Sequence, residues 1–540
     1  MRRIMLFLAN FVIFLSTLKE SILFLLNIRN FQKSQDKLFQ SILKKNRITQ
    51  YIQSLNNGKN VPLSNWSNYD PYIKQILNFE QYILTLERVL LLEPTSGTSS
   101  PSKYVPYTKG LQKQFNKAIN PWLFGIYSKW PKLFFCSQYW SVSPEVVHSQ
   151  NNKPQRITIG FEQDSQYLGK KRGNIMNMIF SVPCEIKNCD NPENWVYLTA
   201  YFLLRDRDLG LISIWHPSFL AIIIDKIKKQ YSRLIDDIEK GTDSTNPILK
   251  NFRNNEKLKP DISRSQELRR FVNKEEIDFS KIWPGLKVIS CWADNYDETS
   301  LRELKRLFPK VFFQPKGLIA TEGIVSFPFG KVFGIPAFRS HFLEFIDLRD
   351  ESVKKLNQLE KGQEYEVVIT TSGGLYRYKM NDVILVKGFC MRNLPMFQFL
   401  YKRDYVSDMR GEKIGLQHVT QLETELRNKF KGIHFFMLSP VLEGSSAYYS
   451  VYIHADNSDN FPFHEMSVFA DEFLKQNFHY DYARKIGQLG NLKVFKLNGS
   501  PAETIINYIE STGIKRGDIK LYPLNKLPIW HNLLDGIFVD

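Results

Sequence analysis

The chain has 540 residues, which is too long for one ordinary hydrophobic core and predicts two to four domains. Its 43% hydrophobic and 24% charged residues are typical of a folded globular protein and exclude the disordered, collagen-like and disulfide-scaffold classes. The net charge of +17 comes from basic residues spread along the chain without a long run, and no zinc finger or aromatic RNA-binding signature is present, so we predict no nucleic-acid partner.

The chain begins with an apolar stretch over residues 4–28 that follows Arg2 and Arg3. Its first part, Ile4 to Leu18, is shorter than the roughly 20 residues that span a bilayer, and no A-x-A cleavage site follows it. We therefore predict a helix that is buried or touches a membrane. The five cysteines include no C-x-x-C pair, which favours a reducing compartment and a cytoplasmic protein.

Helical spacing of apolar residues continues beyond this stretch. It runs through Phe39, Ile42 and Leu43, and again from Ile73 through Leu84 to Leu90. These patterns predict that residues 1–90 form a helical segment packed on a larger domain.

The middle of the chain alternates predicted helices and strands. Apolar spacing predicts a helix over residues 219–238, with Gly241 just beyond its end, and a second helix over 299–308. Short apolar or β-branched runs predict strands at 286–291, 311–313 and 365–371. This alternation predicts an α/β fold. A charged, turn-like stretch over residues 401–414 predicts a boundary between a large domain, 91–403, and a small C-terminal domain, 404–540.

Two segments carry side chains suited to phosphate and metal. Residues 95–103 are rich in hydroxyl groups and end at Lys103, a composition that suits a polyphosphate, although such a loop is more often simply solvated. The loop is not a Walker loop, because G-x-x-x-x-G-K-[ST] is missing. In the segment 316–323, Glu322 precedes a glycine and suits Mg²⁺, although one such glutamate is more often a turn residue.

Two further segments complete the set. Residues 365–382 form a predicted strand, then a Ser-Gly-Gly turn, and end at Asp382, which suits ribose hydroxyls; Arg377 and Asp382 are otherwise read as a surface pair. Residues 402–414 form a charged turn containing Gly411, which by itself indicates only a solvated connection.

In this order and at these separations, the four segments resemble the adenylate-forming superfamily. More closely, the chain resembles the acyl-acid amido synthetases first known from plant auxin-responsive genes, in their bacterial form. That resemblance runs from about Glu93 to Leu521, and it is carried by the following signatures: Trp215-His216-Pro217-Ser218-Phe219-Leu220, Trp283-Pro284-Gly285-Leu286, Ser290-Cys291-Trp292, Gly374-Leu375-Tyr376-Arg377-Tyr378, Tyr482-Ala483-Arg484, Gly487-Gln488-Leu489-Gly490 and Gly517-Asp518-Ile519-Lys520. One departure is Ser100, where the family usually has a glycine that tolerates positive φ.

The resemblance implies an adenylate-forming fold, with a large N-terminal domain of mixed sheets and helices and a small mobile C-terminal α+β domain. It implies ATP and Mg²⁺ as cofactors, with Lys520 and Glu322 catalytic, Glu322 as the metal ligand, and a hinge from Asp404 to Asp408. The residues expected to bind the nucleotide are Thr95, Ser96, Gly97, Thr98, Ser99, Lys103, Gly317, Ala320, Thr321, Glu322, Gly323, Tyr376, Arg377, Asp382, Phe399 and Arg403.

The function implied by the resemblance is the activation of a carboxylic acid as an acyl-adenylate, followed by transfer of the acyl group to an amine, expected to be an amino acid. Two alternatives stay open: an acyl-CoA-forming ligase, and a non-catalytic, membrane-associated relative. Trp122, Phe124 and Phe180 are candidates for lining an acyl pocket, although core filling is the more common role of such residues.

Overall fold

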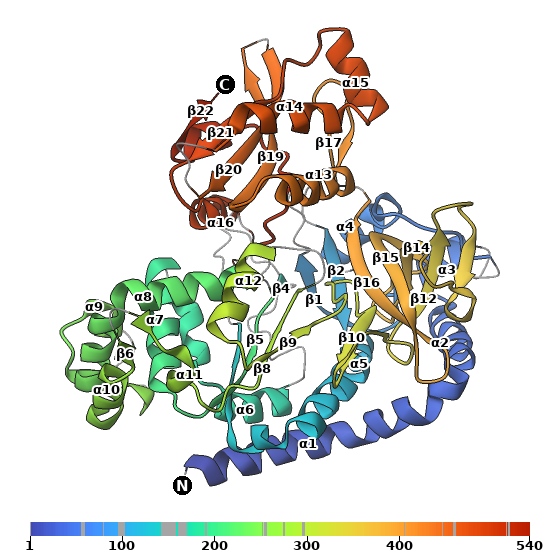
Figure 1. The fold of residues 1–540 in the computed structure, drawn as a ribbon. Coiled ribbons are helices and arrows are strands. Elements are labelled where there is room, and N and C mark those ends of the chain that lie inside the picture. Colours follow the sequence, from blue (N-terminus) through green and yellow to red (C-terminus); the bar gives the residue numbers. More distant parts are fainter. Residues whose placement is uncertain are drawn as a thin grey trace.

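The computed structural model describes residues 2–55, 60–78, 80–94, 103–141, 158–159, 170–189, 192–215, 217–250, 252, 256–273, 276–293, 298–403, 405–444, 446–456, 461–512, 514, 516 and 519–539. In Figure 1 the C-terminal elements form an upper block, and α1 (Arg2–Asn27) runs along the bottom of the molecule. The helices that follow it are α2 (Phe31–Asn46), α3 (Gln50–Ser54) and α4 (Asp70–Leu77).

The predicted helical segment is wrong in its last part. Helix α4 ends at Leu77, and Leu90 lies in a strand, β1 (Val89–Pro94). Leu84 is fully buried in irregular chain, where its carbonyl accepts a hydrogen bond from the Tyr376 hydroxyl at 2.7 Å. The apolar spacing from Ile73 to Leu90 therefore reflects burial by distant segments rather than one face of a helix.

A four-stranded parallel sheet forms the centre of the large block. Its order is β3-β5-β8-β9, and alternate side chains of each strand enter two different cores. Helices α7 and α8 pack on the face that carries Ile212 and Ile289, while α5 packs toward the face that carries Leu211 and Val288. The elements of this block are β3 (Ser137–Trp140), β4 (Thr158–Ile159), β5 (Leu209–Ser213), β8 (Val288–Cys291), β9 (Phe312–Pro315), α5 (Lys109–Lys129), α6 (Lys170–Ile179), α7 (Pro192–Arg205), α8 (Pro217–Lys240), α9 (Pro247–Lys250), α10 (Ile262–Arg269), β6 (Val272–Asn273), β7 (Glu276–Ile277), α11 (Phe279–Ile282) and α12 (Glu298–Leu307).

A five-stranded antiparallel sheet, in the order β13-β12-β14-β15-β16, lies beside the parallel sheet and shares a core with α5 and α1. The hairpin of β1 with β2 (Tyr104–Thr108) and the pair β10–β11 complete this region. The strands are β10 (Ser326–Phe329), β11 (Val332–Pro336), β12 (Phe342–Asp347), β13 (Val353–Lys355), β14 (Glu364–Thr370), β15 (Tyr378–Cys390) and β16 (Leu394–Lys402).

The upper block has its own four-stranded sheet, in the order β19-β20-β21-β22. Helices α13 and α14 pack on one face, around Leu438 and Val451, while α16 packs on the other, around Met437 and Phe495. Its elements are β17 (Val406–Ser407), β18 (Ile414–Gly415), α13 (Leu416–Lys429), β19 (Ile433–Glu443), β20 (Ser446–Ala455), α14 (Phe463–Leu474), α15 (Phe478–Lys485), β21 (Lys493–Leu497), α16 (Ala502–Ser511), α17 (Trp530–Leu533) and β22 (Gly536–Val539).

The predicted elements of the middle region are confirmed to within a few residues. The helix predicted at 219–238 is α8, and the helix predicted at 299–308 is α12. The strands predicted at 286–291, 311–313 and 365–371 are β8, β9 and β14.

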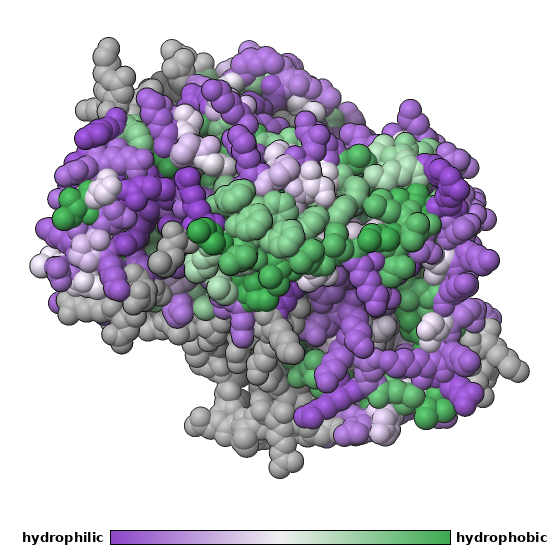
Figure 2. All heavy atoms as spheres, turned by 90° about the horizontal axis from the view of Figure 1, so that it is seen from below, coloured by the Kyte–Doolittle hydropathy of each residue, from purple (hydrophilic) through white to green (hydrophobic). Residues whose placement is uncertain are grey.

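Helix α1 lies on the outside of the molecule with a long apolar face turned outward. Figure 2 views the molecule from below and shows a band of apolar side chains across this surface. Among the described residues, the continuous helix Arg2–Asn46 is long and apolar enough to cross a membrane, and 28% of its most apolar window is buried in the protein.

Candidate active site

The predicted phosphate loop joins the two strands of the β1–β2 hairpin. Thr95, Ser96, Gly97, Thr98 and Ser99 lie outside the described residues. The strands that hold the loop are paired up to its base, where Pro94 lies opposite Tyr104. Lys103, the last residue of the loop, has its Nζ 3.5 Å from the Tyr378 hydroxyl at the start of β15. The end of the loop at Lys103 therefore lies beside the strand that carries Asp382.

The turn between β14 and β15 packs against the same hairpin. Gly373 lies so close to the Pro106 carbonyl oxygen of β2 that a Cβ there would be 2.7 Å from it. Gly374 has φ of 105° and lies equally close to Leu84, so both glycines are needed for the approach. This contact brings the predicted ribose segment next to the predicted phosphate loop.

In the segment 316–323, Thr321 and Glu322 lie in a tight turn that follows β9 and is called the T-E turn below. Ala320 and Gly323 exchange backbone hydrogen bonds of 3.0 and 3.2 Å, which leaves Thr321 and Glu322 at the tip. A Cβ on Gly323 would lie 2.6 Å from Ile369 of β14. Gly317, which precedes the turn, has φ of 78° against the Ser326 carbonyl, a conformation that favours glycine. The T-E turn thus packs on the strand that leads into the ribose segment.

A buried, uncharged histidine packs against this turn. His341 is fully buried, and a Cβ on Gly323 would lie 2.9 Å from its ring. Burial lowers the pKa of His341 to about 3, and its Nδ1 is 2.7 Å from the Ser340 hydroxyl. The imidazole is therefore uncharged at neutral pH and adds no positive charge beneath Glu322.

Glu322 itself is half-buried and has no hydrogen-bond or ion-pair partner among the described residues. The described part of the chain contains no group of three or more His, Cys, Asp or Glu side chains that could hold a metal ion alone. Mg²⁺ commonly binds one or two carboxylates and completes its octahedron with water and substrate phosphates. A single half-buried carboxylate such as Glu322 fits that requirement.

Asp382 lies near the start of β15, beside the turn that follows β14. Its side chain is almost fully buried, and one carboxylate oxygen is 3.2 Å from Lys402 Nζ, on the opposite residue of β16. Asn381, just before it, has φ of 58°, and its carbonyl accepts a hydrogen bond from the Arg403 backbone at 2.7 Å. Phe399 is half-buried on the neighbouring strand.

Three predicted nucleotide-binding side chains are engaged elsewhere. The Tyr376 side chain is in the core, stacked on Tyr51 at 5.5 Å. The Arg377 guanidinium pairs with both carboxylate oxygens of Glu344, at 2.8 and 3.1 Å. Arg403 donates to Glu366 and to Glu351, each at 2.8 Å. These contacts hold the turn and the sheet edge together. They give no support to the prediction that the three side chains bind the nucleotide.

The predicted hinge is described only in part. Asp404 lies outside the described residues, while Asp408 is exposed and accepts a hydrogen bond from the Gly411 amide at 2.7 Å. The buried Glu412 accepts from the Met409 and Arg410 amides, each at 2.7 Å. The carboxylates of Asp408 and Glu412 therefore hold this charged turn in place by accepting hydrogen bonds from its backbone amides.

The carboxyl ends of the parallel strands carry a row of aromatic and cationic side chains from segments that the sequence analysis named, but to which it assigned no shared role. Trp215 follows β5, Trp292 follows β8 and Lys316 follows β9. The two indole rings lie 5.1 Å apart, and Lys316 Nζ is 5.1 Å from the Trp215 ring. Ligands of α/β sheets bind at this edge, a rule that could have directed attention to these residues.

Lys520 joins this row from the C-terminal block. Its Nζ lies 3.8 Å from the centre of the Trp292 ring. Lys316 is nearly buried, donates to the Ser213 hydroxyl at 2.6 Å, and also lies 5.1 Å from the Trp122 ring. Two lysines from distant parts of the sequence thus meet one aromatic row, in an arrangement of cation–π contacts.

The candidate acyl-pocket residues are packed inside the protein. The Trp122 indole donates to Gln314 at 2.9 Å, and Phe124 stacks on Phe14 of α1 at 5.5 Å. Phe180 is buried and lies 6.2 Å from Trp140. Trp122 alone borders the aromatic row, while Phe124 serves the packing of α1.

Comparisons with known proteins agree with these features. The profile of the "GH3 family N-terminal domain" matches residues 23–311, more than half of the chain, and that of the "GH3 family central domain" matches residues 334–402. The chain belongs to the GH3 family of acyl-acid amido synthetases. A GH3 relative from Arabidopsis thaliana, "4-substituted benzoates-glutamate ligase GH3.12", is 22% identical over 91% of this chain and 92% of its own. One from Oryza sativa subsp. japonica, "Probable indole-3-acetic acid-amido synthetase GH3.11", is 22% identical over 76% and 75%.

Solved structures confirm the predicted fold class of this GH3 protein. "GH3.15 acyl acid amido synthetase" matches with a TM-score of 0.78 at 19% identity, covering 96% of each chain. A 2-hydroxyisobutyryl-CoA ligase matches with a TM-score of 0.51 at 10% identity, covering 92% of this chain and 89% of its own. The mixed α/β architecture is therefore that of the adenylate-forming enzymes.

Proposed function

We propose that this GH3 protein uses ATP to adenylate a carboxylic acid and then transfers the acyl group to the amine of an amino acid. The observation that supports this most directly is the position of Lys520, which reaches from the C-terminal block to Trp292 at the carboxyl edge of the parallel sheet. The contacts among the hairpin, the T-E turn and β14–β15 supply the second support, because three distant segments meet in one place.

The first step has an electrostatic problem that the proposed residues address. A carboxylate oxygen attacks the α-phosphorus of ATP, forming a P–O bond as pyrophosphate leaves, so two anions approach each other. The hydroxyl and amide groups of residues 95–99 would donate to the phosphates, and Lys103 and Lys520 would offset their charge. Glu322 would hold Mg²⁺, which supplies Lewis-acid stabilisation of phosphate charge when it is bound.

Asp382 would fix the nucleotide by accepting hydrogen bonds from ribose hydroxyls. Lys402 holds one of its oxygens at 3.2 Å, which orients the carboxylate. Phe399 lies on β16, next to the strand that carries Asp382, and would pack against the nucleotide. Such positioning is a large part of catalysis when two reactants must be aligned.

In the second step, the amine nitrogen attacks the acyl carbon, the C–O bond to AMP breaks, and the nitrogen loses a proton. We propose that the block after Asp404 rotates about the turn at Asp408 between the steps, so that Lys520 serves adenylation only. The boundaries that go with this proposal are a helical segment, 1–90, an ATP- and acyl-binding domain, 91–403, and a small domain, 404–540. That the chain is a bacterial member of the family stays a prediction.

The substrates of relatives support a small organic acid and an amino acid as the reactants. Relatives are named for 4-substituted benzoates with glutamate and for indole-3-acetic acid, and one solved GH3 structure holds 2,4-DB. Pyrophosphate exchange measured over a panel of such acids tests the first step. Offering CoA and a mixture of amino acids separately, with the product mass as readout, tests the second; a CoA thioester as the only product would contradict the proposal.

Lys520→Ala is the sharpest test of the proposed division of roles. We expect acid-dependent ATP–pyrophosphate exchange to fall by about 100-fold or more, because a cation at the phosphates is lost. Aminolysis of a supplied acyl-adenylate should change by only a few-fold. Lys493→Ala is the matched control, since Lys493 Nζ also lies over an aromatic ring, that of Tyr448 at 4.3 Å, within the C-terminal sheet. Equal loss of both half-reactions would contradict the division.

A further inference from the structure

The outward face of α1 is made of large apolar side chains at helical spacing. Their exposed fractions range from 39% at Phe11 to 69% at Leu26, far above the exposed fraction that is usual for such residues. At 1.5 Å per residue the face extends for about 33 Å along the helix, and Lys19 lies between its two parts. The residues of this apolar face are Ile4, Leu8, Phe11, Leu15, Ile22 and Leu26.

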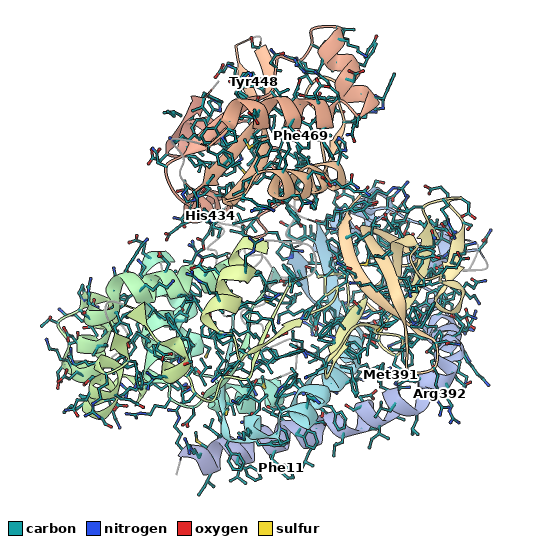
Figure 3. All side chains as sticks on the ribbon, viewed as in Figure 1. Phe11, Met391, Arg392, His434, Tyr448 and Phe469 are labelled. Atoms are coloured by element: carbon teal, nitrogen blue, oxygen red, sulfur yellow. The ribbon has the colours of Figure 1, made fainter. Side chains whose placement is uncertain are left out.

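The figures show this apolar face as part of the outer surface. Figure 2 shows it as a band across the underside of the molecule, and Figure 3 shows Phe11 pointing away from the body. Exposed side chains of neighbouring elements, Phe135 and Met178, extend the band. Contiguous apolar surface of this kind marks an interaction site.

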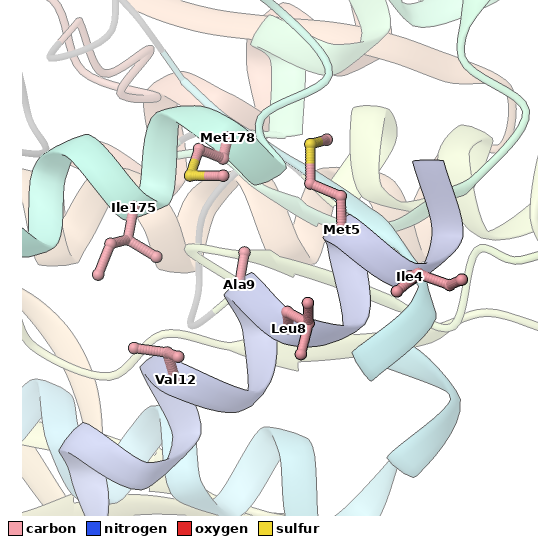
Figure 4. Close-up of a pocket in the computed structure, with 7 residues that line it drawn as sticks. All are labelled: Ile4, Met5, Leu8, Ala9, Val12, Ile175 and Met178. Atoms are coloured by element: carbon pink, nitrogen blue, oxygen red, sulfur yellow. The ribbon is translucent and has the colours of Figure 1, made fainter. Parts of the chain in front are cut away.

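A shallow apolar hollow opens within this band. It lies between the first turns of α1 and the side chains of Ile175 and Met178 on α6, and its volume is about 410 Å³. Figure 4 shows Met5, Ala9 and Val12 of α1 facing the two α6 side chains across it. The hollow has almost no polar lining, so an acyl chain or another apolar group suits it better than water does.

The exposed charges of α1 are all positive. Lys19 and Arg29, just after the helix, are exposed on the same side as the apolar face, and Arg2 and Arg3 at its start pair with Asp206 and Asp208 at 2.6 and 3.1 Å. Glu20 is the one acidic residue of α1; it is turned inward and pairs with Arg339 at 3.3 Å. An apolar stripe bordered by Lys and Arg is the composition of helices that lie in the plane of an anionic membrane surface.

The opposite face of α1 argues against a spanning helix. Asn10 is fully buried and donates to the carbonyls of Phe134 and Cys136, at 3.1 and 2.9 Å. The side-chain amide oxygen of Asn10 accepts hydrogen bonds from the Tyr127 hydroxyl and the Gln138 side-chain amide. Insertion across a bilayer would remove these partners, each at a free-energy cost in hydrocarbon.

A second copy of the chain is also a poor occupant of this face. If two α1 helices packed in parallel, Lys19 would meet Lys19; if they packed antiparallel, Arg29 would lie at the end that carries Arg2 and Arg3, whose charge Asp206 and Asp208 only partly offset. Like charges opposed at such distances are destabilising. An anionic lipid surface instead satisfies both the apolar residues and the cations.

We propose that α1 docks this protein on the surface of an anionic lipid bilayer, with its apolar face in the headgroup–acyl boundary and its inner face bound to the protein. The inference does not depend on the ligase activity. It accounts for the outward apolar face, the all-positive exposed charge and the apolar hollow together.

The test is co-sedimentation of the full chain with vesicles of phosphatidylcholine alone or mixed with phosphatidylglycerol. We expect binding to the mixed vesicles, weaker binding at high salt, and release by alkaline carbonate. In the triple variant Leu8→Gln, Leu15→Gln, Ile22→Gln, binding should fall at least tenfold, because the apolar area that enters the lipid is lost. The matched control is Ile262→Gln, Phe478→Gln, Ile537→Gln, which removes three apolar side chains that are at least 56% exposed elsewhere.

Three outcomes would overturn the proposal. The first is absence of vesicle binding by the unaltered chain, and the second is equal binding by the triple variant. The third is a lipid-free dimer in analytical ultracentrifugation that the triple variant abolishes, which would assign the apolar face to a second copy. Circular dichroism of both triple variants checks that the substitutions, all at exposed positions, leave the fold intact.

Discussion

Helices α1 and α8 are both long and both lie at the surface of the large block, but their exposed faces differ. Helix α8 buries Ile223, Ile227 and Leu234 and exposes Lys228 and Lys229. Helix α1 buries Leu6, Ile13 and Phe24 together with the polar Asn10, Thr17 and Ser21, and it also exposes leucine and isoleucine. Water explains the orientation of α8, because charged side chains stay hydrated while apolar ones are removed from water. The exposed apolar residues of α1 do not follow this rule, and the lipid surface proposed for them would remove them from water.

Removing an apolar side chain should therefore have different effects on the two helices. Ile227→Ala on α8 should lower the free energy of unfolding by about 3 kcal/mol, because Ile227 is fully buried and a cavity would remain. Leu15→Ala on α1 should change it by less than about 0.5 kcal/mol, because Leu15 is already 47% exposed. Urea denaturation of the two variants measures both. Equal losses would show that the Leu15 side chain is part of a packed interface.

The inner face of α1 can be probed through the thiol beneath it. Burial, with the nearby Asp208 and Asp206 carboxylates, raises the pKa of Cys136 to about 11, and Asn10 of α1 binds its carbonyl. Relative to the ordinary thiol pKa of 9.0, two pH units reduce the thiolate fraction at pH 8 by about 100-fold. Cys136 should therefore react with iodoacetamide about 100-fold more slowly than a thiol of that ordinary pKa.

The reaction should become faster by about tenfold per pH unit as the pH rises toward 11, since the thiolate is the reactive form. Mass spectrometry of the labelled peptide gives the rate at each pH. Asn10→Ala, which loosens the contact of α1 with the Phe134–Cys136 segment, should increase the rate at pH 8. A rapid reaction in the unaltered chain would contradict a firmly seated α1.

The two helices also mark the limit of what the sequence can predict. The apolar spacing of α8 defines it to within two residues at each end, because its environment is water on one side and a core on the other. In α1 the apolar residues occupy most of the helix, so spacing alone does not say which side faces the protein. The answer depends on Asn10, whose partners Tyr127 and Gln138 are more than 100 residues away in the sequence.

The candidate site likewise contains local segments, which a short stretch of sequence can indicate, and contacts between distant segments, which it cannot. The T-E turn and the hairpin loop are local, so their residues could be predicted from short segments. The Trp215–Trp292 contact and the approach of Lys520 depend on strand order and on how the C-terminal block lies, which no short segment specifies. Tyr376 and Arg377 were predicted from a local pattern, yet their side chains are held by Leu84 and Glu344, through contacts between distant parts of the chain.

The smallest expected effects on stability come from one exposed ion pair on each helix. Arg3 of α1 lies 3.1 Å from Asp208, and Lys229 of α8 lies 2.8 Å from Asp225, and both cations are more than 70% exposed. Because exposed ion pairs contribute little, Arg3→Ala and Lys229→Ala should each change the unfolding free energy by less than about 0.5 kcal/mol. Urea denaturation would then not distinguish them.

Vesicle binding should distinguish them, since a cation near an anionic surface contributes about 1 kcal/mol, or roughly fivefold in affinity. Arg3→Ala should weaken binding to phosphatidylglycerol-containing vesicles by about that factor, and Lys229→Ala should leave it unchanged. If both variants weakened binding equally, the attraction would come from the net charge of +17 over the whole molecule. A difference confined to Arg3 would instead assign it to α1, because screening limits the effect of a charge to about 10 Å at moderate salt.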